Sequence, residues 1–470
     1  MSGRTVIQKP WPWLIAAALV IGIYLASLAI HVQGGDPRPT GSAEEIAKLA
    51  ERKDLNVLFV LVDTLRGERL GSYGYGRDTS PTLDLLAASG VRFAHQLSQS
   101  SWTKCSMASL WTSLYPAHNG VTRFDQVIPE EATLPAEILK QAGFHTVGLY
   151  RNGWVAPNFG FGQGFDIYDK PRPGTIPPSV KRENPTLKEA GSDDDVVNSA
   201  IEFLRVSGRD RWFLYLHLMD VHEYLYDQET AVFGTSYSDI YDNSILHLDQ
   251  ILDQLFGYLS QNGYLENTLV VLTADHGEAF GERGFEGHAR EVYRETTEVP
   301  WIISFPFRLA PGVTVDVRTQ NVDVWPTILD LLGLPALPRS DGRSRKPEIL
   351  AAARDEAMPA EDPQQAIAHI DRFWGRPVLV AAPVVAVVED GLRYVTVHNG
   401  NTVQEELFDA KTDPLEKRSV LAVRPEDAGR LRAVAEQYLE SPAIWDSAPA
   451  TLELDEIQLN QLRALGYALP

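Results

Sequence analysis

The stretch LNVLFVLVDT, Leu55 to Thr64, indicates the fold of this 470-residue chain. Its apolar residues form a nearly continuous run that ends at Asp63. Such a run is typical of a strand buried on both faces of a parallel sheet. We therefore expect a central strand here, with Asp63 at its carboxyl end.

Helix patterns alternate with strand patterns from this stretch onward, over residues 55–337. SPTLDLLAASGVRF predicts a helix that begins after Ser80, with Pro81 in its first turn, and ends at Gly90. ATLPAEILKQAGFHTVGLYRN predicts a helix and then a strand ending at Asn152, whereas YDNSILHLDQILDQLFGYLSQNG and VDVWPTILDLLGL predict helices. The alternation predicts an α/β fold with a mainly parallel central sheet flanked by helices.

Polar residues stand at the ends of three predicted strands. They are Asp63, then His217, Asp220 and His222 in RWFLYLHLMDVH, then Asp275 and His276 in NTLVVLTADHG. Ligands of such sheets bind outside the carboxyl ends of the strands, so these side chains should converge. Asp63, Asp275 and His276 suit one divalent zinc or manganese ion, since calcium prefers oxygen ligands alone. Any one of them alone is more simply explained as a helix cap or turn residue.

The pattern changes after residue 337. PVLVAAPVVAVVEDGLRYVTVHN predicts short strands around a turn at Asp390 and Gly391, and the end of the chain reads as helical. Residues 338–470 are therefore predicted to form a small α+β C-terminal subdomain, following a catalytic domain at residues 55–337.

The N-terminal region predicts a membrane anchor. Leu14 to Ile30 carries no charge and, with Trp11 and Trp13, is long enough to span a bilayer. Arg4 and Lys9 precede it, which favours a cytoplasmic N-terminus and a periplasmic or extracellular catalytic domain. We therefore predict a single-pass membrane protein, with an anchor at residues 1–33 and a linker at residues 34–54. The alternative is a cleaved signal peptide.

Charge and cysteine content exclude several classes of protein. The formal charge of −21 argues against nucleic acid or anionic lipid as the main partner, because both require basic patches. A single cysteine, Cys105, excludes both an intrachain disulfide framework and a cysteine-cluster metal site.

Five stretches, in this order, resemble motifs of the sulfatase branch of the alkaline-phosphatase superfamily. They are NVLFVLVDTLRGERLGSYGY, FLYLHLMDVHEYL, TLVVLTADHGEAFGERG, VDVWPTILDLLGL and EELFDAKTDPLEKRSVLA. The resemblance implies an alkaline-phosphatase-like fold and a metal-dependent enzyme that cleaves anionic esters.

The stretch SSWTKCSMASLWTSLYP, Ser100 to Pro116, resembles the family's nucleophile motif, C-x-P-S-R-x-x-L-L-T-G-x-Y-P. Aligning Cys105 with the family's cysteine leaves the distance to Tyr115 two residues short. Alignment from Tyr115 backwards needs no gap and puts Thr103 at the nucleophile position. The resemblance then implies an unmodified threonine in place of formylglycine, as in phosphate-processing members. The alternatives are Thr103 as a helix N-cap and Cys105 as the nucleophile.

The same resemblance implies roles for other residues. Asn152 aligns with a lysine that contacts the transferred group, and His222 and His288 are candidates to protonate the leaving oxygen. Alternatively, Asp220, His222 and His288 form a second metal site. The predicted catalytic residues are Thr103, Asn152, His222 and His288, and the predicted metal ligands are Asp63, Thr103, Asp275 and His276. Arg66 is expected either to pair with the substrate or to be exposed to solvent.

The leading hypothesis is a membrane-anchored, metal-dependent hydrolase of phosphate or sulfate esters that acts through a covalent Thr103 intermediate. Its substrate would be an anionic ester of a glycan, a lipid head group or a small molecule. One alternative is a transferase that moves a phospho-substituent between lipid or glycan alcohols. Another is a non-catalytic binding protein on a sulfatase fold.

Overall fold

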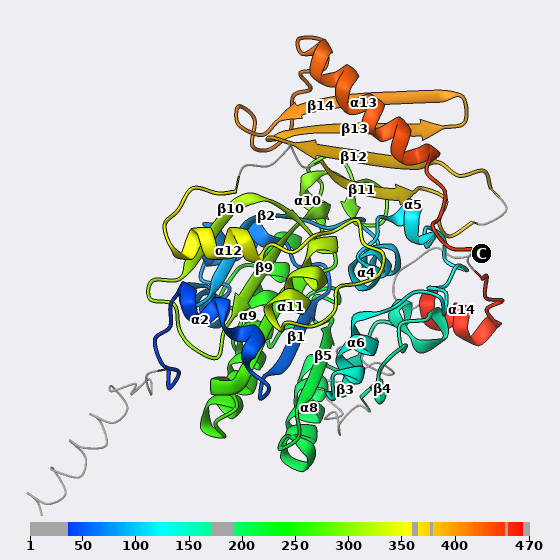
Figure 1. The fold of residues 1–470 in the computed structure, drawn as a ribbon. Coiled ribbons are helices and arrows are strands. Elements are labelled where there is room, and N and C mark those ends of the chain that lie inside the picture. Colours follow the sequence, from blue (N-terminus) through cyan, green and yellow to red (C-terminus); the bar gives the residue numbers. More distant parts are fainter. Residues whose placement is uncertain (1–35, 172–190, 360–364, 377–378, 447–449, 464–470) are drawn as a thin grey trace, which may run out of the picture. The chain divides into compact units, whose positions relative to one another are not determined.

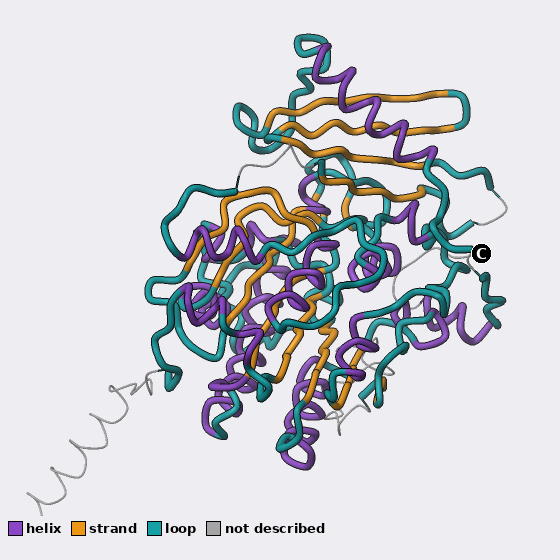
Figure 2. The backbone as a smooth tube through the Cα atoms, in the orientation of Figure 1, coloured by secondary structure: helices purple, strands orange, loops and turns teal. Residues whose placement is uncertain are grey.

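An eight-stranded sheet forms the centre of the fold (Figures 1 and 2). The computed structural model describes residues 36–171, 191–359, 365–376, 379–446 and 450–463. The strand order is β10-β2-β9-β6-β1-β5-β3-β4. These strands are β1 Asn56–Val62, β2 Val91–Leu97, β3 His145–Tyr150, β4 Ile167–Asp169, β5 Trp212–Leu218, β6 Thr268–Ala274, β9 Glu298–Ser304 and β10 Val313–Gln320. Among them β9 alone runs antiparallel to its neighbours, which confirms the predicted mainly parallel sheet.

Strand β1 lies between β5 and β6, and all seven of its residues are buried. Its side chains alternate between two apolar cores: Val57, Phe59 and Leu61 belong to one, and the residues between them belong to the other. Burial on both faces explains why the sequence of this strand is apolar at every position rather than at every second one.

Helices cover both faces of the sheet. Helices α3 Pro81–Ala88, α8 Asp193–Ser207 and α9 Tyr237–Gln261 pack against one face. Helices α4 Thr103–Thr112, α6 Pro135–Gln141 and α11 Val324–Leu331 pack against the other. On this second face the rings of Trp111 and Trp325 lie 5.2 Å apart, and Trp325 stacks on Phe59 of β1 at 5.0 Å. The sheet with helices on both sides is the predicted α/β architecture.

A second, antiparallel sheet follows in the C-terminal part. It consists of β11 Ala366–Asp371, β12 Pro383–Glu389, β13 Leu392–Asn399 and β14 Thr402–Asp409. Helix α13 Pro425–Glu440 lies across it (Figure 1), and α14 Glu456–Arg463 comes last. The predicted turn at Asp390 and Gly391 joins β12 to β13 with φ values of 50° and 82°. Two residues with positive φ are typical of a tight hairpin turn.

Six shorter α-helices and strands, together with several 3-10 helices, complete the described structure: α2 Ala43–Ala47, α5 Pro116–Asn119, α10 Arg294–Thr297, α12 Lys346–Ala353, β7 Ala279–Phe280 and β8 Glu286–Gly287. Helix α2 falls in the predicted linker and α12 near the start of the predicted C-terminal subdomain. Each of them buries an isoleucine, Ile46 and Ile349, in the core that also contains Trp111. A single apolar anchor on a short helix is too weak a periodic signal to stand out in a polar sequence.

Across the described ranges, no helix has the length and apolarity needed to cross a membrane. The predicted anchor at residues 1–33, including Leu14 to Ile30, lies outside the described residues.

Acid should destabilise the C-terminal part through His369 of β11. Its Nδ1 lies 3.0 Å from the hydroxyl of Tyr438 on α13, and burial lowers the pKa of His369 from 6.5 to about 4. The unfolded chain therefore binds this proton first as the pH falls. The free energy of unfolding should decrease between pH 6.5 and about 4, by at most about 3 kcal/mol. Urea unfolding of the wild type and His369→Gln across this range measures the effect. An identical loss in both proteins would contradict the prediction.

Candidate active site

Asp63 and Asp275 lie side by side at the carboxyl ends of β1 and β6. The two strands are parallel and pair Val62 with Ala274, so the residue that follows each strand emerges at the same edge of the sheet. Both carboxylates are fully buried. His276 follows directly, and ligand atoms of Asp63, Asp275 and His276 lie within 4.8 Å of one another.

Each carboxylate has one oxygen bonded within the protein and one without a hydrogen bond. Asp275 Oδ1 accepts from the backbone N–H groups of Thr64 and His276, at 3.1 and 2.9 Å. Asp63 Oδ2 accepts from Asn152 Nδ2 at 2.6 Å. The remaining oxygens, Asp63 Oδ1 and Asp275 Oδ2, are buried and accept no hydrogen bond. Buried carboxylate oxygens are costly in that state, so their arrangement fits a bound cation.

The ring of His276 is oriented to add a nitrogen ligand. Its Nδ1 lies 2.9 Å from the carbonyl oxygen of Gly277, which can only accept, so Nδ1 carries the proton. The lone pair of Nε2 then lies 3.3 Å from Asp275 Oδ2 and 3.9 Å from Asp63 Oδ1. Two carboxylate oxygens and one imidazole nitrogen form a donor set suited to zinc or manganese.

Electrostatics also favour a cation here. Burial raises the pKa of Asp275, and the nearby charge of Asp63 raises it further. Burial acts to raise the pKa of Asp63 as well, but His222, His217 and His276 outweigh it and the pKa is lowered. Asp63 is therefore ionised, whereas the ionised form of the neighbouring Asp275 is disfavoured by burial and by the charge of Asp63. A divalent ion would relieve this repulsion.

Thr64, which directly follows Asp63, has a strained backbone conformation. Its φ is 63°, a left-handed value that is unfavourable for a β-branched residue. The carbonyl oxygen of Thr64 accepts from the Tyr241 hydroxyl at 2.6 Å, and its Oγ1 donates to the carbonyl of Asp63 at 2.7 Å. These bonds maintain the turn in which the Thr64 N–H reaches Asp275. Strain of this kind is concentrated at functional sites.

The structure places Thr103, and not Cys105, at the carboxylate cluster. Thr103 Oγ1 lies 3.2 Å from His276 Nε2 and 3.4 Å from Asn152 Nδ2. The thiol of Cys105 is instead 3.8 Å from the backbone carbonyl of His369. Burial raises the pKa of Cys105 to about 12, which disfavours the reactive thiolate.

Helix α4 begins at Thr103, and the N-cap position before it is taken by Trp102. The alternative in which Thr103 is only an N-cap is therefore wrong. As the first residue of the helix, Thr103 holds its hydroxyl at the positive end of the helix dipole.

Asn152 is both a turn residue and part of the site. Its Oδ1 accepts from the N–H of Trp154 at 2.9 Å, which caps a short 3-10 helix, Gly153–Val155. Its Nδ2 points the other way, toward Asp63 and Thr103. One end of the Asn152 amide therefore shapes the turn while the other end belongs to the site.

His217 also belongs to the site, although the sequence analysis assigned it no role. It is fully buried near the end of β5, with Nε2 3.2 Å from Asp63 Oδ2 and Nδ1 2.7 Å from the hydroxyl of Tyr215. Its position at a strand end was the available signal, because β5 lies directly beside β1.

His288 and His222 lie next to this cluster. The ring of His288 is centred 4.6 Å from that of His276 and 5.1 Å from that of His222. His288 Nδ1 lies 3.1 Å from an oxygen of Glu278, a buried carboxylate. Burial acts to raise the pKa of Glu278, but His288 and neighbouring histidines lower it, so this carboxylate is ionised and orients the ring. Glu278 lies on a loop that follows β6, and no periodic pattern in the sequence marks it.

Asp220 forms an ion pair away from the metal cluster. Its carboxylate is bonded to the buried guanidinium of Arg151, which also pairs with Asp193 at 2.7 Å and with Glu223. A second metal site formed by Asp220, His222 and His288 is therefore not assembled. In the part of the chain that the structure describes, Asp63, Asp275 and His276 are the one group of three that could hold a metal ion.

Arg66 matches neither of its two expected roles. It is buried, and it donates to the carbonyl of Glu278 at 2.9 Å and to the carboxylate of Glu282 at 2.6 Å. Its function is to support the loop that carries Glu278.

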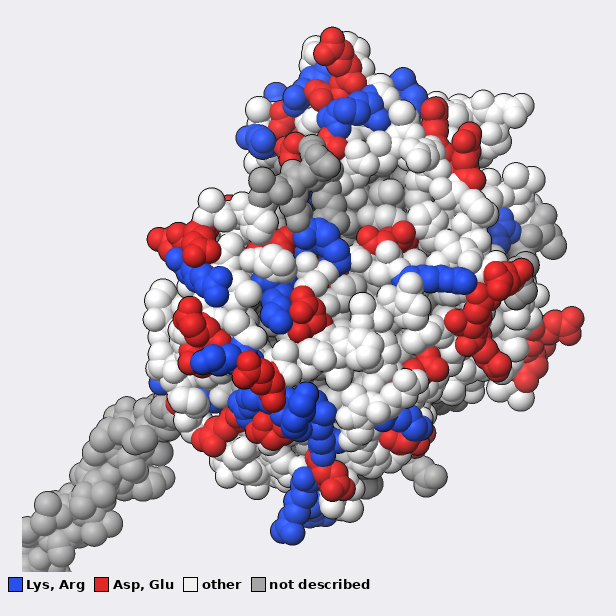
Figure 3. Space-filling model, viewed as in Figure 1, with Lys and Arg blue, Asp and Glu red and all other residues white. Residues whose placement is uncertain are grey.

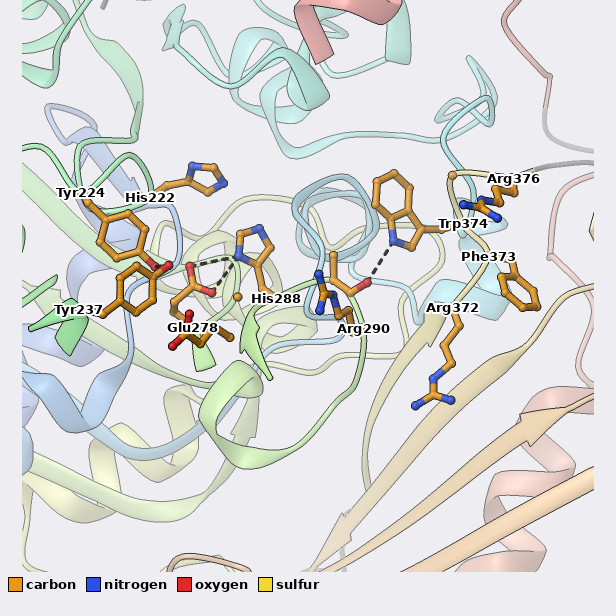
Figure 4. Close-up of a pocket in the computed structure, with 14 residues that line it drawn as sticks. His222, Tyr224, Tyr237, Glu278, His288, Arg290, Arg372, Phe373, Trp374 and Arg376 are labelled. Carbon is orange, nitrogen blue, oxygen red and sulfur yellow. Dashed lines mark hydrogen bonds and ion pairs between the residues drawn. The ribbon is translucent and has the colours of Figure 1, made fainter. Parts of the chain in front are cut away.

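A cavity of about 620 Å³ opens beside the cluster (Figure 4). Its lining is His222, Tyr224, Tyr237, Glu278, Glu286, Gly287, His288, Ala289, Arg290 and residues 372–376. The last group follows β11 in the C-terminal part of the chain. Trp374 stacks on Trp102 at 4.2 Å, directly before Thr103. This wall could not be predicted, because nothing in the sequence connects residues 372–376 with the catalytic stretch.

Known proteins share both the sequence pattern and the fold. The chain is similar to an ulvan-active sulfatase of Formosa agariphila, with 26% identity over 428 residues that cover 82% of this chain and 81% of the relative. The structure resembles the phosphonate monoester hydrolase of Agrobacterium radiobacter, with a TM-score of 0.62, 20% identity and coverage of 82% and 96%. It also resembles a protein solved in complex with its substrate D-glucosamine-2-N,6-O-disulfate, with a TM-score of 0.64, 17% identity and coverage of 82% and 97%.

The family model described as Sulfatase matches residues 55–334, which include β1, α4 and β6. Members of this family depend on a metal ion, and the buried donor set at the carboxyl ends of β1 and β6 fits one. The chain therefore belongs to the sulfatase family and is an ester hydrolase.

Proposed function

We propose that this protein hydrolyses phosphate or sulfate esters through a covalent intermediate on Thr103. One observation carries the proposal: the Thr103 hydroxyl lies 3.2 Å from the imidazole nitrogen of a buried cluster that also contains two carboxylate oxygens without a hydrogen bond. The residues that would hold the metal ion are Asp63, Thr103, Asp275 and His276.

A bound zinc or manganese ion would stabilise the threonine alkoxide and neutralise charge on the ester group. The protein's own residues provide the rest. The start of α4 adds a positive dipole end at Thr103. Asn152 Nδ2, now directed at Asp63 and Thr103, can donate to a non-bridging oxygen of the ester group in the transition state.

The reaction has two steps. Thr103 Oγ1 loses its proton to water and attacks phosphorus or sulfur, so that a new bond to Oγ1 forms while the bond to the ester oxygen breaks. His288, oriented by Glu278, gives a proton to the departing oxygen and the alcohol leaves. Water then attacks the same atom, His288 takes up a proton from it, and Thr103 is released and protonated again.

Phosphate esters are the proposed preference. Thr103 carries a plain hydroxyl, and the thiol of Cys105, the cysteine of this stretch, faces the backbone of His369. Anchoring through residues 1–33 and a periplasmic or extracellular location remain predictions from the sequence.

Substitution of Thr103 tests the nucleophile. Thr103→Ala should lower kcat for 4-nitrophenyl phosphate by about a thousandfold or more, because no other hydroxyl replaces the lost one. Thr103→Ser should keep more activity. Cys105→Ala is the matched control and should keep most of it. Parallel assays on 4-nitrophenyl phosphate and 4-nitrophenyl sulfate also report the preferred ester. Activity in Thr103→Ala together with its loss in Cys105→Ala would overturn the assignment.

The leaving alcohol should reveal the role of His288. His288→Gln should reduce kcat/KM about a hundredfold for an alkyl phosphate, whose leaving oxygen needs a proton. The loss should be under about tenfold for 4-nitrophenyl phosphate, because its leaving group, 4-nitrophenolate, departs readily without a proton. Glu278→Gln should show the same contrast to a smaller degree. His95→Gln, at a half-exposed histidine of β2, is the control. An equal loss on both esters would exclude His288 as the general acid.

Metal content provides a further test. The purified protein should contain about one equivalent of zinc or manganese, and a chelator should abolish activity and lower Tm because two buried carboxylates are left to repel each other. Asp275→Asn should weaken metal binding, measured by elemental analysis and by the metal-dependent rise in Tm. Asp316→Asn, at a largely exposed aspartate, should change neither. A metal-free protein with the same Tm would refute the metal site.

A further inference from the structure

Three arginines line the active-site cavity without a close ion pair to a carboxylate of the described residues. Arg290, Arg372 and Arg376 share this cavity with His222 and His288. All three are exposed, and none of them forms an ion pair with any residue that the structure describes. Figure 4 shows Arg372 and Arg376 toward one end of the cavity and His222, with Tyr224 and Tyr237, toward the other, while Arg290 lies between them, beside His288.

The protein as a whole is acidic, with a formal charge of −21. Other arginines, such as Arg66, Arg151 and Arg393, each bind at least two carboxylates. On the face drawn in Figure 3, basic side chains lie among acidic ones. Three unpaired guanidinium groups around one cavity therefore leave a local positive charge that can attract an anionic ligand.

The backbone that carries these arginines is held firmly against the catalytic stretch. Trp374, between Arg372 and Arg376, stacks on Trp102, and its Nε1 donates to the carbonyl of Ala289 at 3.1 Å. Ala289 directly precedes Arg290. One tryptophan thus links both arginine-bearing segments to the residue before the candidate nucleophile, which keeps them at a set distance from the reacting group.

The leaving alcohol of the substrate must extend into this cavity. The transferred group is bound at the buried cluster around Thr103, and His288, which protonates the leaving oxygen, lines the cavity. The part of the substrate beyond that oxygen therefore faces the cavity. A volume of about 620 Å³ accommodates a sugar or a molecule of similar size.

We propose that Arg290, Arg372 and Arg376 form a second anion-binding subsite for the leaving alcohol. The natural substrate would then be an ester with at least two anionic groups: one is hydrolysed, and a retained sulfate, phosphate or carboxylate binds the arginines. This inference rests on the proposed function and specifies its substrate class. Besides Glu278, the lining contains one acidic side chain, Glu286, which is exposed. Its negative charge would repel a retained anionic group that lay near it instead of near the arginines.

Matched substrate pairs test the subsite. Phenyl phosphate is compared with 1,4-phenylene bisphosphate, and glucose 6-phosphate with glucose 1,6-bisphosphate, by phosphate release. The corresponding 4-carboxyphenyl ester and sulfate esters distinguish which second anion is preferred. The wild type should favour the doubly anionic member of at least one pair by about tenfold or more in kcat/KM, and added salt should reduce this preference.

Variants of the three arginines test whether these residues cause the preference for doubly anionic esters. Arg290→Ala, Arg372→Ala and Arg376→Ala should each reduce the ratio of kcat/KM, doubly over singly anionic, by about tenfold, mainly through KM. Arg372→Lys should retain part of it. Arg205→Ala, at an exposed arginine of α8, is the control and should leave the ratio unchanged. Equal losses on both members of a pair, or a wild type without a preference, would overturn the subsite.

Failure of the proposed function is distinguishable from failure of the subsite. If the wild type releases phosphate or sulfate from none of the esters, the proposed function is wrong. Calorimetry with glucose 1,6-bisphosphate then tests the subsite alone, and the arginine variants should bind it about tenfold more weakly than the wild type. Equal affinity in the wild type and the variants would overturn the subsite as well.

Discussion

The rest of the structure depends on one constraint: two carboxyl groups are held side by side in a buried site. The parallel pairing of β1 and β6 places Asp63 and Asp275 side by side with no access to water. Their repulsion is kept within the fold because one oxygen of each accepts hydrogen bonds from groups fixed in place. These are backbone N–H groups for Asp275 and, for Asp63, the side chain of Asn152, which caps a 3-10 helix. The oxygens without a hydrogen bond define the position where a cation fits. Thr103, at the start of α4, contacts His276 beside that position.

The site is completed by parts of the chain that are far apart in sequence. Trp374 comes from the segment after β11 and stacks on Trp102, immediately before Thr103. Arg151 ties the end of β3 to Asp220 after β5, and thereby keeps Asp220 away from the metal cluster. The C-terminal part is therefore a wall of the active-site cavity as well as a second sheet, and this arrangement makes its arginines available to the substrate.

Much of the fold could be predicted because buried parallel strands leave a direct pattern. The apolar run of β1, the helix patterns between the strands and the Asp390–Gly391 turn each correspond to an observed element. Short elements such as α2 and α12 could not be predicted, since each depends on one isoleucine that finds its partners only in the assembled core. In the site, Asp63, Asp275 and His276 were predictable as strand-end residues. His217 also stood at a predicted strand end, but its role depends on its contact with Asp63, and Glu278 was missed because it lies on a loop without a periodic pattern.

The sequence by itself determined the order of strands and helices, the polar residues at the strand ends and the spacing that separates Thr103 from Cys105. These follow from local periodicity and from motifs, which are properties of neighbouring residues. Tertiary structure alone decided that Thr103 faces His276 of the metal cluster while Cys105 faces His369, and that Asp220 pairs with Arg151. It also decided that three arginines from two distant segments share one cavity. The physical reason is that direction and burial depend on packing between segments distant in sequence, which no local pattern records.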